Sequence, residues 1–162
     1  CYEVPVGFKY ISAKMAETNA VIGGESSGGL AVRGHIAGKD GIYAAALLVE
    51  MLAVTGKSVS QLYQEITDKY GMLYYEDAAF TMTQARKAEL QEKLFVKLEV
   101  PDFGNAVEKI NRTDGCKVYF NDGSWVICRF SGTEPLLRMA AEGESQSQAR
   151  TYIRIWREEL GL

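Results

Sequence analysis

Two short apolar segments joined by Asn-Asp-Gly at residues 121–123 constrain the fold of this chain more than any other feature. Asn, Asp and Gly tolerate the positive φ angles of tight hairpin turns, so this segment predicts a β-hairpin. Its strands are expected over residues 116–120 and 124–130. Side chains alternate between the two faces of a strand, so the side chains of Arg129 and Cys128 are expected on opposite faces of the second strand.

The residues around the hairpin complete the pattern of a small layered fold. A short helix is expected over residues 102–112, a third strand over residues 136–143, and a final helix capped by Ser145. The final helix repeats apolar residues at helical spacing, which predicts a buried stripe of Ala149, Tyr152, Ile153, Trp156 and Leu160. Antiparallel strands with helices on one face form an α+β layer, and this is the fold class predicted here.

The start of the chain predicts a separate α/β unit. Residues 1–8 are rich in strand-forming types, and Ser12 can cap a short helix over residues 13–19. Residues 20–25 have the composition of a buried strand that ends in glycines. Cys1 is not an initiator Met, so the chain is expected to be a piece of a longer protein.

Two further helices are expected in this unit. Asp40 can cap a helix over residues 41–55, whose apolar spacing predicts a buried face and which Gly56 can end. A second helix begins with a capping-box pattern, Ser58 with Gln61, and ends at Gly71.

A polar stretch at residues 81–94 is expected to be helical and to connect the two units. The predicted domains are therefore a partial α/β domain over residues 1–88 and a small α+β domain over residues 89–162.

Composition and charge exclude several classes of function. The chain has 162 residues, of which 47% are hydrophobic and 24% charged, with a net charge of −3, so a broad nucleic-acid-binding surface is not expected. No apolar run approaches the roughly 18 residues that a membrane helix needs, and no signal peptide is recognisable. We expect no membrane partner and no nucleic-acid partner.

Cysteine and histidine are scarce. Cys1, Cys116 and Cys128 form no CxxC pair, which fits a cytoplasmic location with the cysteines as small buried hydrophobic residues. His35 is the only histidine, so a histidine-based metal site or catalytic triad is not expected.

The turn between two arginines at residues 129–138, here the arginine-flanked turn, has the chemistry of an anion site. Its hydroxyls and main-chain N–H groups come from Ser131, Gly132 and Thr133, and Arg129 and Arg138 add guanidinium groups that match a phosphate. Glu134 is expected to orient one of the arginines. A plain tight turn with surface arginines is the alternative.

A second loop of interest, here the glycine loop, is Gly-Gly-Glu-Ser-Ser-Gly-Gly at residues 23–29. It follows a strand and lacks both the phosphate-binding and the dinucleotide-binding glycine patterns. Glu25 and Ser27 could bind vicinal hydroxyls of a sugar at the carboxyl end of that strand. The alternative is a flexible surface loop, and the nearby basic residues Lys9, Arg33, His35 and Lys39 could face a phosphate or be solvated.

Four segments in this order resemble the α-D-phosphohexomutase superfamily, the phosphoglucomutases and phosphomannomutases. They are VGFKY (6–10), GGESSGG (23–29), KDG (39–41) and RFSGTEPLLR (129–138). The resemblance implies part of the third family domain and the whole fourth domain, the latter with a fold like the TATA-box-binding protein. Ser26 departs from the Glu or Met common in relatives, which leaves the preferred sugar open.

The resemblance also implies roles for single residues. Glu25 and Ser27 would bind sugar hydroxyls, Lys39 would lie near the sugar phosphate, and Lys9 is a weaker candidate of the same kind. Arg129, Ser131, Gly132, Thr133 and Arg138 would bind the phosphate that is not transferred. The nucleophilic serine of the family is absent, so no catalytic residue is expected in this chain.

The implied activity is interconversion of hexose 1-phosphate and hexose 6-phosphate through a bisphosphorylated intermediate. The full-length enzyme would use Mg²⁺, with ligands outside this chain, and hexose 1,6-bisphosphate as activator and intermediate. The chain alone would be inactive, with a phosphorylated hexose and the N-terminal domains as partners, and an exposed sheet edge could allow self-association. The alternative is a non-catalytic module that binds sugar phosphates or other anions; a structural or nucleic-acid-binding unit is disfavoured by the pI of about 5.3.

Overall fold

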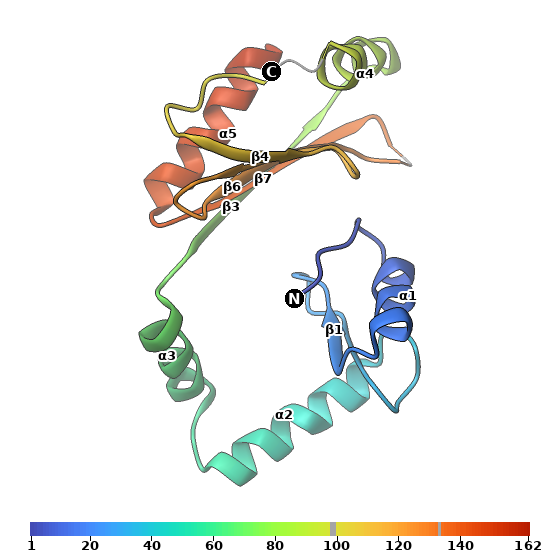
Figure 1. The fold of residues 1–162 in the computed structure, drawn as a ribbon, viewed down its shortest axis with the longest axis vertical. Helices are drawn as coiled ribbons and strands as arrows, with labels where there is room; N and C mark the ends of the chain where they lie inside the picture. Colours follow the sequence, from blue (N-terminus) through green and yellow to red (C-terminus); the bar gives the residue numbers. More distant parts are fainter. Residues whose placement is uncertain (98–99, 133) are drawn as a thin grey trace. The chain divides into compact units, whose positions relative to one another are not determined.

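The computed structural model describes residues 1–97, 100–132 and 134–162. These residues form two compact units, Cys1–Gly71 and Met72–Leu162 (Figure 1). The division lies earlier than the expected boundary after residue 88, because the strand and helix that follow Gly71 belong to the second unit. Both units combine helix and sheet, as predicted.

The second unit is built on a five-stranded antiparallel sheet with the order β3-β7-β6-β5-β4. Its strands are β3 (Tyr74–Thr81), β4 (Val107–Asn111), β5 (Cys116–Phe120), β6 (Trp125–Phe130) and β7 (Leu136–Gly143). The predicted hairpin joins β5 to β6, and its Gly123 has the positive φ of 84° that the sequence predicted. The third predicted strand is β7, which pairs with β6 on one side and with β3 on the other.

Helices cover one face of this sheet. α4 (Gln84–Gln91), the π-helix η1 (Glu92–Val96) and α5 (Gln146–Leu160) supply apolar side chains to one core with the sheet (Figure 1). All members of the predicted α5 stripe are buried: Ala149, Tyr152, Ile153, Trp156 and Leu160. Ser145 caps α5 by accepting a hydrogen bond from the N–H of Gln148, as predicted. Leu90 of α4 and Leu94 of η1 are both buried in the same core.

The prediction of a helix over residues 102–112 was wrong, because this segment contains the edge strand β4. Val107 lies opposite Phe120 and Lys109 lies opposite Tyr119, so β4 has one extra residue and forms a β-bulge. Val107 and Ile110 are three residues apart in the sequence, a spacing that resembles a helical pattern. Because of the bulge they pair with Phe120 and Val118, which share one face of β5. The edge strand β3 was not predicted from the sequence either.

The first unit contains three helices and a two-stranded hairpin. α1 (Phe8–Thr18) and α2 (Gly41–Thr55) flank the hairpin of β1 (Ile22–Gly24) and β2 (Leu30–Val32), and α3 (Val59–Tyr70) follows. Asp40 and Gly56 bound α2, and the capping box of Ser58 and Gln61 begins α3, as predicted. In α1, however, Ser12 lies inside the helix, where its hydroxyl donates to the carbonyl of Phe8 at 3.1 Å.

Burial in the first unit differs from the prediction. Only Ala31 is buried among residues 1–71, and neither β1 nor α2 contains a buried residue. Ile42 of α2 is 87% exposed. The apolar residues of α2 have the predicted spacing, but none of them is buried. Residues 1–5, expected to be strand-like, have no regular structure.

No single helix among the described residues is long and apolar enough to span a membrane. α2 and α3 pass that test only as a pair, by length and composition, and they are bent by 82° at the break between them.

Candidate functional site

The glycine loop joins β1 to β2, and its main chain closes as a tight turn. The N–H of Glu25 donates to the carbonyl of Gly29 at 2.9 Å, and the N–H of Gly28 donates to the carbonyl of Glu25 at 2.9 Å. Gly28 has a φ of 95°, which favours glycine. The turn fixes the main chain of Glu25 at the tip of the hairpin.

The structure brings together three of the predicted sugar-site residues. The Glu25 carboxylate accepts from the Lys39 ammonium at 3.0 Å and from the Ser27 hydroxyl at 3.5 Å. The Glu25 side chain is 20% exposed and that of Lys39 is 53% exposed. Acidic, hydroxyl and basic groups therefore converge beside the glycine loop, within reach of a polar ligand.

Gly29 makes room for this cluster. A Cβ added at Gly29 would lie 2.5 Å from Cδ of Lys39 and 3.1 Å from Oε2 of Glu25. Real Cβ atoms do not approach other atoms so closely, so any side chain at Gly29 would move Lys39. The lack of a side chain at Gly29 thus permits the Lys39–Glu25 ion pair.

The other basic residues considered as phosphate ligands, Lys9, Arg33 and His35, contact groups outside this cluster. The Lys9 ammonium lies 4.9 Å from the ring centroid of Tyr10, and Arg33 donates to the carbonyl of Asn19 at 2.8 Å. His35 bonds to the second carboxylate oxygen of Asp40 at 2.8 Å and stacks on Tyr43.

Asp40 joins His35 to the start of α2. Its other oxygen accepts the main-chain N–H groups of Ile42 and Tyr43, each at 3.0 Å. The hydrogen bond from Tyr43, with that from His35, holds the pKa of Asp40 below its usual value.

The arginine-flanked turn joins β6 to β7 and places its two arginines side by side. Arg129 and Arg138 are direct partners in the β6–β7 register, so both side chains point away from the core-forming face. Arg129 is half-buried and Arg138 is exposed. Within the described residues the ion pairs of the second unit involve other side chains, and neither arginine takes part in one. The two arginines are therefore direct neighbours on the sheet, and neither forms an ion pair with a carboxylate in the described part of the unit.

The turn between the arginines is closed by its own main chain. The N–H of Ser131 donates to the carbonyl of Leu136 at 2.8 Å, and the N–H of Glu134 donates to the hydroxyl of Ser131 at 3.3 Å. Glu134 contributes to these contacts through its main chain and does not pair with either arginine in the described part of the chain, contrary to the role expected for it. Gly132 is exposed, and Thr133 lies outside the described residues.

Two residues that support the turn were not found from the sequence. A Cβ at Gly115, whose φ is 98°, would lie 2.6 Å from the carbonyl oxygen of Cys128 and 3.0 Å from Cβ of Arg129. Gly115 therefore lets the β4–β5 turn pack directly against Arg129. Lys87 of α4 donates to the carbonyls of Ser131 and Glu134. Both contacts join segments distant in sequence, and no local pattern indicates them.

Cys116 and Cys128 are opposite each other in the β5–β6 register and are both fully buried, whereas Cys1 is exposed. Burial raises the pKa of both buried thiols. The sequence prediction of buried hydrophobic cysteines is correct for these two and wrong for Cys1.

Two family models match almost the whole chain. The model of the α/β/α domain III of phosphoglucomutase/phosphomannomutase matches residues 1–70, and that of the C-terminal domain matches residues 81–155. The chain belongs to the phosphoglucomutase/phosphomannomutase family. The glycine loop lies in the part that matches domain III, and the arginine-flanked turn lies in the part that matches the C-terminal domain.

Individual family members agree with this assignment. A phosphoglucomutase/phosphomannomutase of Thermococcus kodakarensis is 33% identical over 97% of the chain. A phosphoglucosamine mutase of Fusobacterium nucleatum is 28% identical over 87% of the chain. A crystal structure assigned as a phosphomannomutase, from Thermus thermophilus, superimposes with a TM-score of 0.71 at 26% identity over 98% of the chain. The chain spans about 31% of the length of the first and the last of these proteins and 27% of the second.

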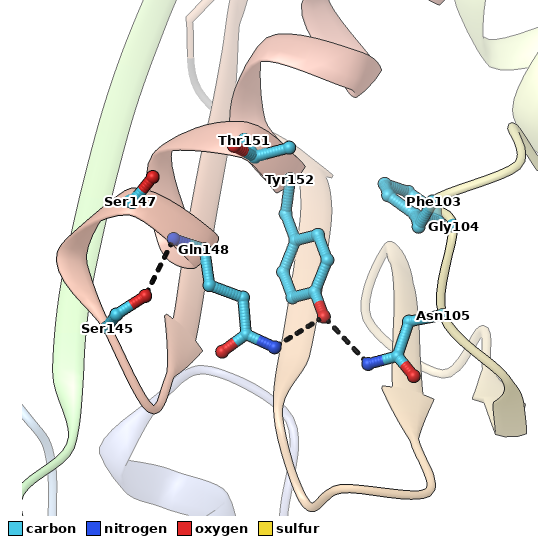
Figure 2. A pocket seen from close by; sticks show the side chains of 8 residues that line it. All are labelled: Phe103, Gly104, Asn105, Ser145, Ser147, Gln148, Thr151 and Tyr152. Carbon is cyan, nitrogen blue, oxygen red and sulfur yellow. Dashed lines mark hydrogen bonds between the residues drawn. The ribbon is translucent and has the colours of Figure 1, made fainter.

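The second unit also has a pocket of about 420 Å³ at the N-terminal end of α5, and none of the predicted site residues lines it (Figure 2). Eight residues line it: Phe103, Gly104, Asn105, Ser145, Ser147, Gln148, Thr151 and Tyr152. The hydroxyl of Tyr152 accepts from Asn105 at 2.9 Å and from Gln148 at 3.0 Å. These polar groups satisfy one another, so the arrangement anchors α5 to the sheet rather than presenting open ligand groups.

The same residues also bind the Asp122 carboxylate of the β5–β6 turn, Asn105 at 2.7 Å and Gln148 at 2.9 Å. Partial burial alone would raise the pKa of Asp122, but hydrogen bonds from Ser124, Asn105 and Gln148 hold it below the usual value. The carboxylate therefore ties the predicted hairpin to α5.

Proposed function

We propose that this chain is the sugar- and phosphate-binding part of a phosphohexomutase that interconverts hexose 1-phosphates and hexose 6-phosphates. Family membership supports the class of reaction, and the names of relatives indicate glucose, mannose and glucosamine phosphates as candidate substrates. The role of this part is to bind the hexose, while domains outside the chain bind and transfer the reacting phosphate.

The observation that carries the proposal is the juxtaposition of Arg129 and Arg138 beside the exposed Gly132. Like charges placed directly opposite each other on a sheet destabilise it. A phosphate group accepts two parallel hydrogen bonds from a guanidinium and would neutralise the pair. Ser131 and Thr133 are proposed as further ligands of this phosphate.

Glu25 and Ser27 are proposed to bind ring hydroxyls of the sugar, and Lys39 to lie near its phosphate. Lys9 is a weaker proposal, because its ammonium contacts a neighbouring tyrosine ring. A mutase of this kind must hold its intermediate in two opposite orientations. Ligands to hydroxyls and to the distant phosphate serve both orientations, since they bind whichever phosphate is not reacting.

The family mechanism implies Mg²⁺ and a hexose 1,6-bisphosphate intermediate. Among the residues that the structure describes, no group of three or more His, Cys, Asp or Glu side chains could hold a metal ion. On the family mechanism, the ligands of Mg²⁺ and the nucleophilic serine are proposed to belong to the N-terminal domains, and the residues of this chain to bind the substrate. A cytoplasmic location and self-association through a sheet edge stay predictions.

A coupled mutase assay tests whether catalysis needs the domains outside this chain. The chain alone with glucose 1-phosphate, glucose 1,6-bisphosphate and Mg²⁺ is expected to give no turnover, and the full-length protein is expected to be active. Turnover by the chain alone would overturn the proposal, and an inactive full-length protein that still binds hexose phosphates would favour the binding-module alternative.

A further inference from the structure

The main chain of the arginine-flanked turn is held from behind by one side chain of α4. The ammonium of Lys87 donates to the carbonyl oxygen of Ser131 at 2.7 Å and to that of Glu134 at 3.3 Å. Lys87 is half-buried, and Ser131 lies 44 residues further along the chain. A single cation thus spans both ends of the segment that contains Gly132.

The contact with Ser131 fixes the direction of a main-chain donor. In a trans peptide unit the C=O and the following N–H point in opposite directions. Because the carbonyl of Ser131 points at Lys87, the N–H of Gly132 points away from it. The N–H groups of Ser131 and Glu134 are used inside the turn, and Pro135 has none, so of the described turn residues Gly132 offers its N–H to a ligand.

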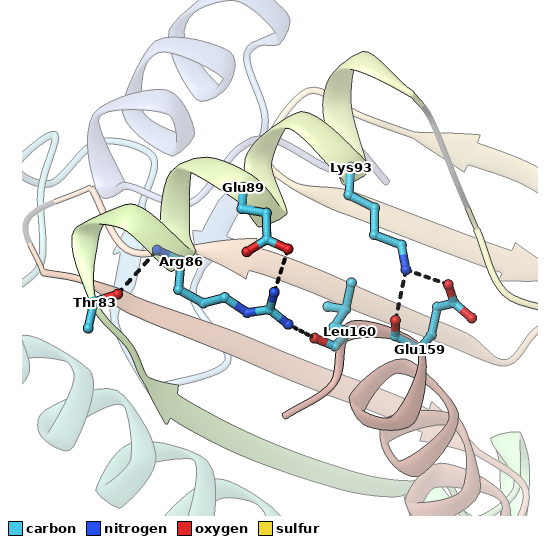
Figure 3. Close-up of polar contacts among 6 residues, drawn as sticks. All are labelled: Thr83, Arg86, Glu89, Lys93, Glu159 and Leu160. Carbon is cyan, nitrogen blue, oxygen red and sulfur yellow. Dashed lines mark hydrogen bonds and ion pairs between the residues drawn. The ribbon is translucent and has the colours of Figure 1, made fainter.

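Lys87 belongs to α4, and side chains of α4 and of the following η1 bind the C-terminal end of α5 (Figure 3). Arg86 donates to the carbonyl of Leu160 at 2.5 Å and pairs with Glu89, while Lys93 donates to the carbonyl and the carboxylate of Glu159. Both cations thus lie at the C-terminal end of α5, where the helix dipole favours positive charge. Leu90, about one turn further along α4, is buried in the core. A rigid helix keeps the Lys87 ammonium in one place relative to the turn.

We propose that Lys87 is a positioning residue for phosphate binding: it aims the Gly132 N–H at the anion and adds a positive charge behind the turn. The inference rests on the proposed function of the arginine-flanked turn. Lys87 donates to carbonyls and not to the phosphate itself, so it acts through the turn and through its charge.

The test uses the whole chain and its Lys87→Met variant, titrated calorimetrically with glucose 1-phosphate. Loss of one hydrogen bond to a charged group corresponds to roughly a tenfold to hundredfold change in affinity. Because Lys87→Met misdirects this hydrogen bond without deleting its donor, it is expected to weaken binding by about tenfold, the lower end of that range. Lys93→Met is the matched control, because it removes the same charge from η1, where the Lys93 ammonium donates to the carbonyl and the carboxylate of Glu159. Lys87→Arg is expected to recover part of the affinity.

A second measurement keeps the test independent of variant folding. In the unmodified chain, the amide resonance of Gly132 is expected to shift on addition of glucose 1-phosphate, and in Lys87→Met this shift is expected to shrink. Equal affinities of Lys87→Met and Lys93→Met, or an unmoved Gly132 amide in a chain that binds the ligand, would overturn the inference. A chain that binds no glucose 1-phosphate at all would instead refute the proposed function.

Discussion

At the scale of single residues, the neighbouring arginines Arg129 and Arg138 are expected to lower the stability of the second unit and to favour phosphate binding. The structure places Arg138 opposite Arg129, and the repulsion between them costs free energy in the unliganded unit. We predict that Arg138→Gln raises the free energy of unfolding by about 0.2–1 kcal/mol and weakens phosphate-ester binding. Chemical denaturation and calorimetry measure the two effects on the same protein.

Lys109→Gln is the control for this variant, since Lys109 is an exposed cation of the edge strand β4 and lies opposite Tyr119. It is expected to leave binding unchanged. A lower stability of Arg138→Gln would show that the arginines do not repel each other in the unliganded protein.

Gly29 offers a second test at this scale. An added methyl group would displace Lys39 and disturb the Lys39–Glu25 pair, yet the displaced atoms belong to an exposed, flexible side chain. We predict that Gly29→Ala weakens hexose-phosphate binding while changing the free energy of unfolding by less than about 1 kcal/mol. Gly38→Ala is the matched control, because nothing lies within 4 Å of its added Cβ. Equal binding by both variants would argue against a role for the cluster.

At the scale of elements, the start of α2 is predicted to depend on pH. The folded pKa of Asp40 is lowered from 3.8 by its hydrogen bonds with Tyr43, His35 and Ile42. A lowered folded pKa means that the capping contribution is fully present above pH 3.8 and is lost as the pH falls through the folded pKa. We expect the first turn of α2 to fray in that acidic range, as measured by amide resonances of residues 41–44.

Asp40→Asn provides the control, since asparagine also caps helices but does not titrate. Its first turn is expected to change less over the same range. Equal fraying of both proteins would show that another group controls the acid sensitivity of α2.

The elements also show what could be predicted from the sequence. Helices α2, α3 and α5 were predicted because their caps, at Asp40, Ser58 and Ser145, are local signals. The edge strands β3 and β4 were not predicted, because their pairing partners lie elsewhere in the chain. In β4 the bulge also interrupts the alternation of side chains between the two faces of the strand.

The same limit applies to the candidate site. Its loops were recognisable because Gly, Ser and Arg cluster locally. The supporting residues Gly115 and Lys87 were not, because they act only through contacts that folding creates.

At the scale of the whole molecule, the two units differ in their cores. The core cluster lies in the second unit, whereas Ala31 is the one buried residue of residues 1–71. We predict that in the isolated chain the amides of α5 and β6 exchange slowly with solvent, while those of α2 and α3 exchange orders of magnitude faster. Hydrogen-exchange mass spectrometry measures this contrast, and equal protection of the two units would contradict the prediction.

The central claim is that the arginine-flanked turn binds the phosphate of a hexose phosphate. Calorimetric titration of the chain and of its Arg129→Ala variant with glucose 1-phosphate tests it most directly. We expect measurable binding that weakens by about 1.5–3 kcal/mol in Arg129→Ala, the range for a lost hydrogen bond to a charged group. An unchanged affinity in Arg129→Ala would contradict it.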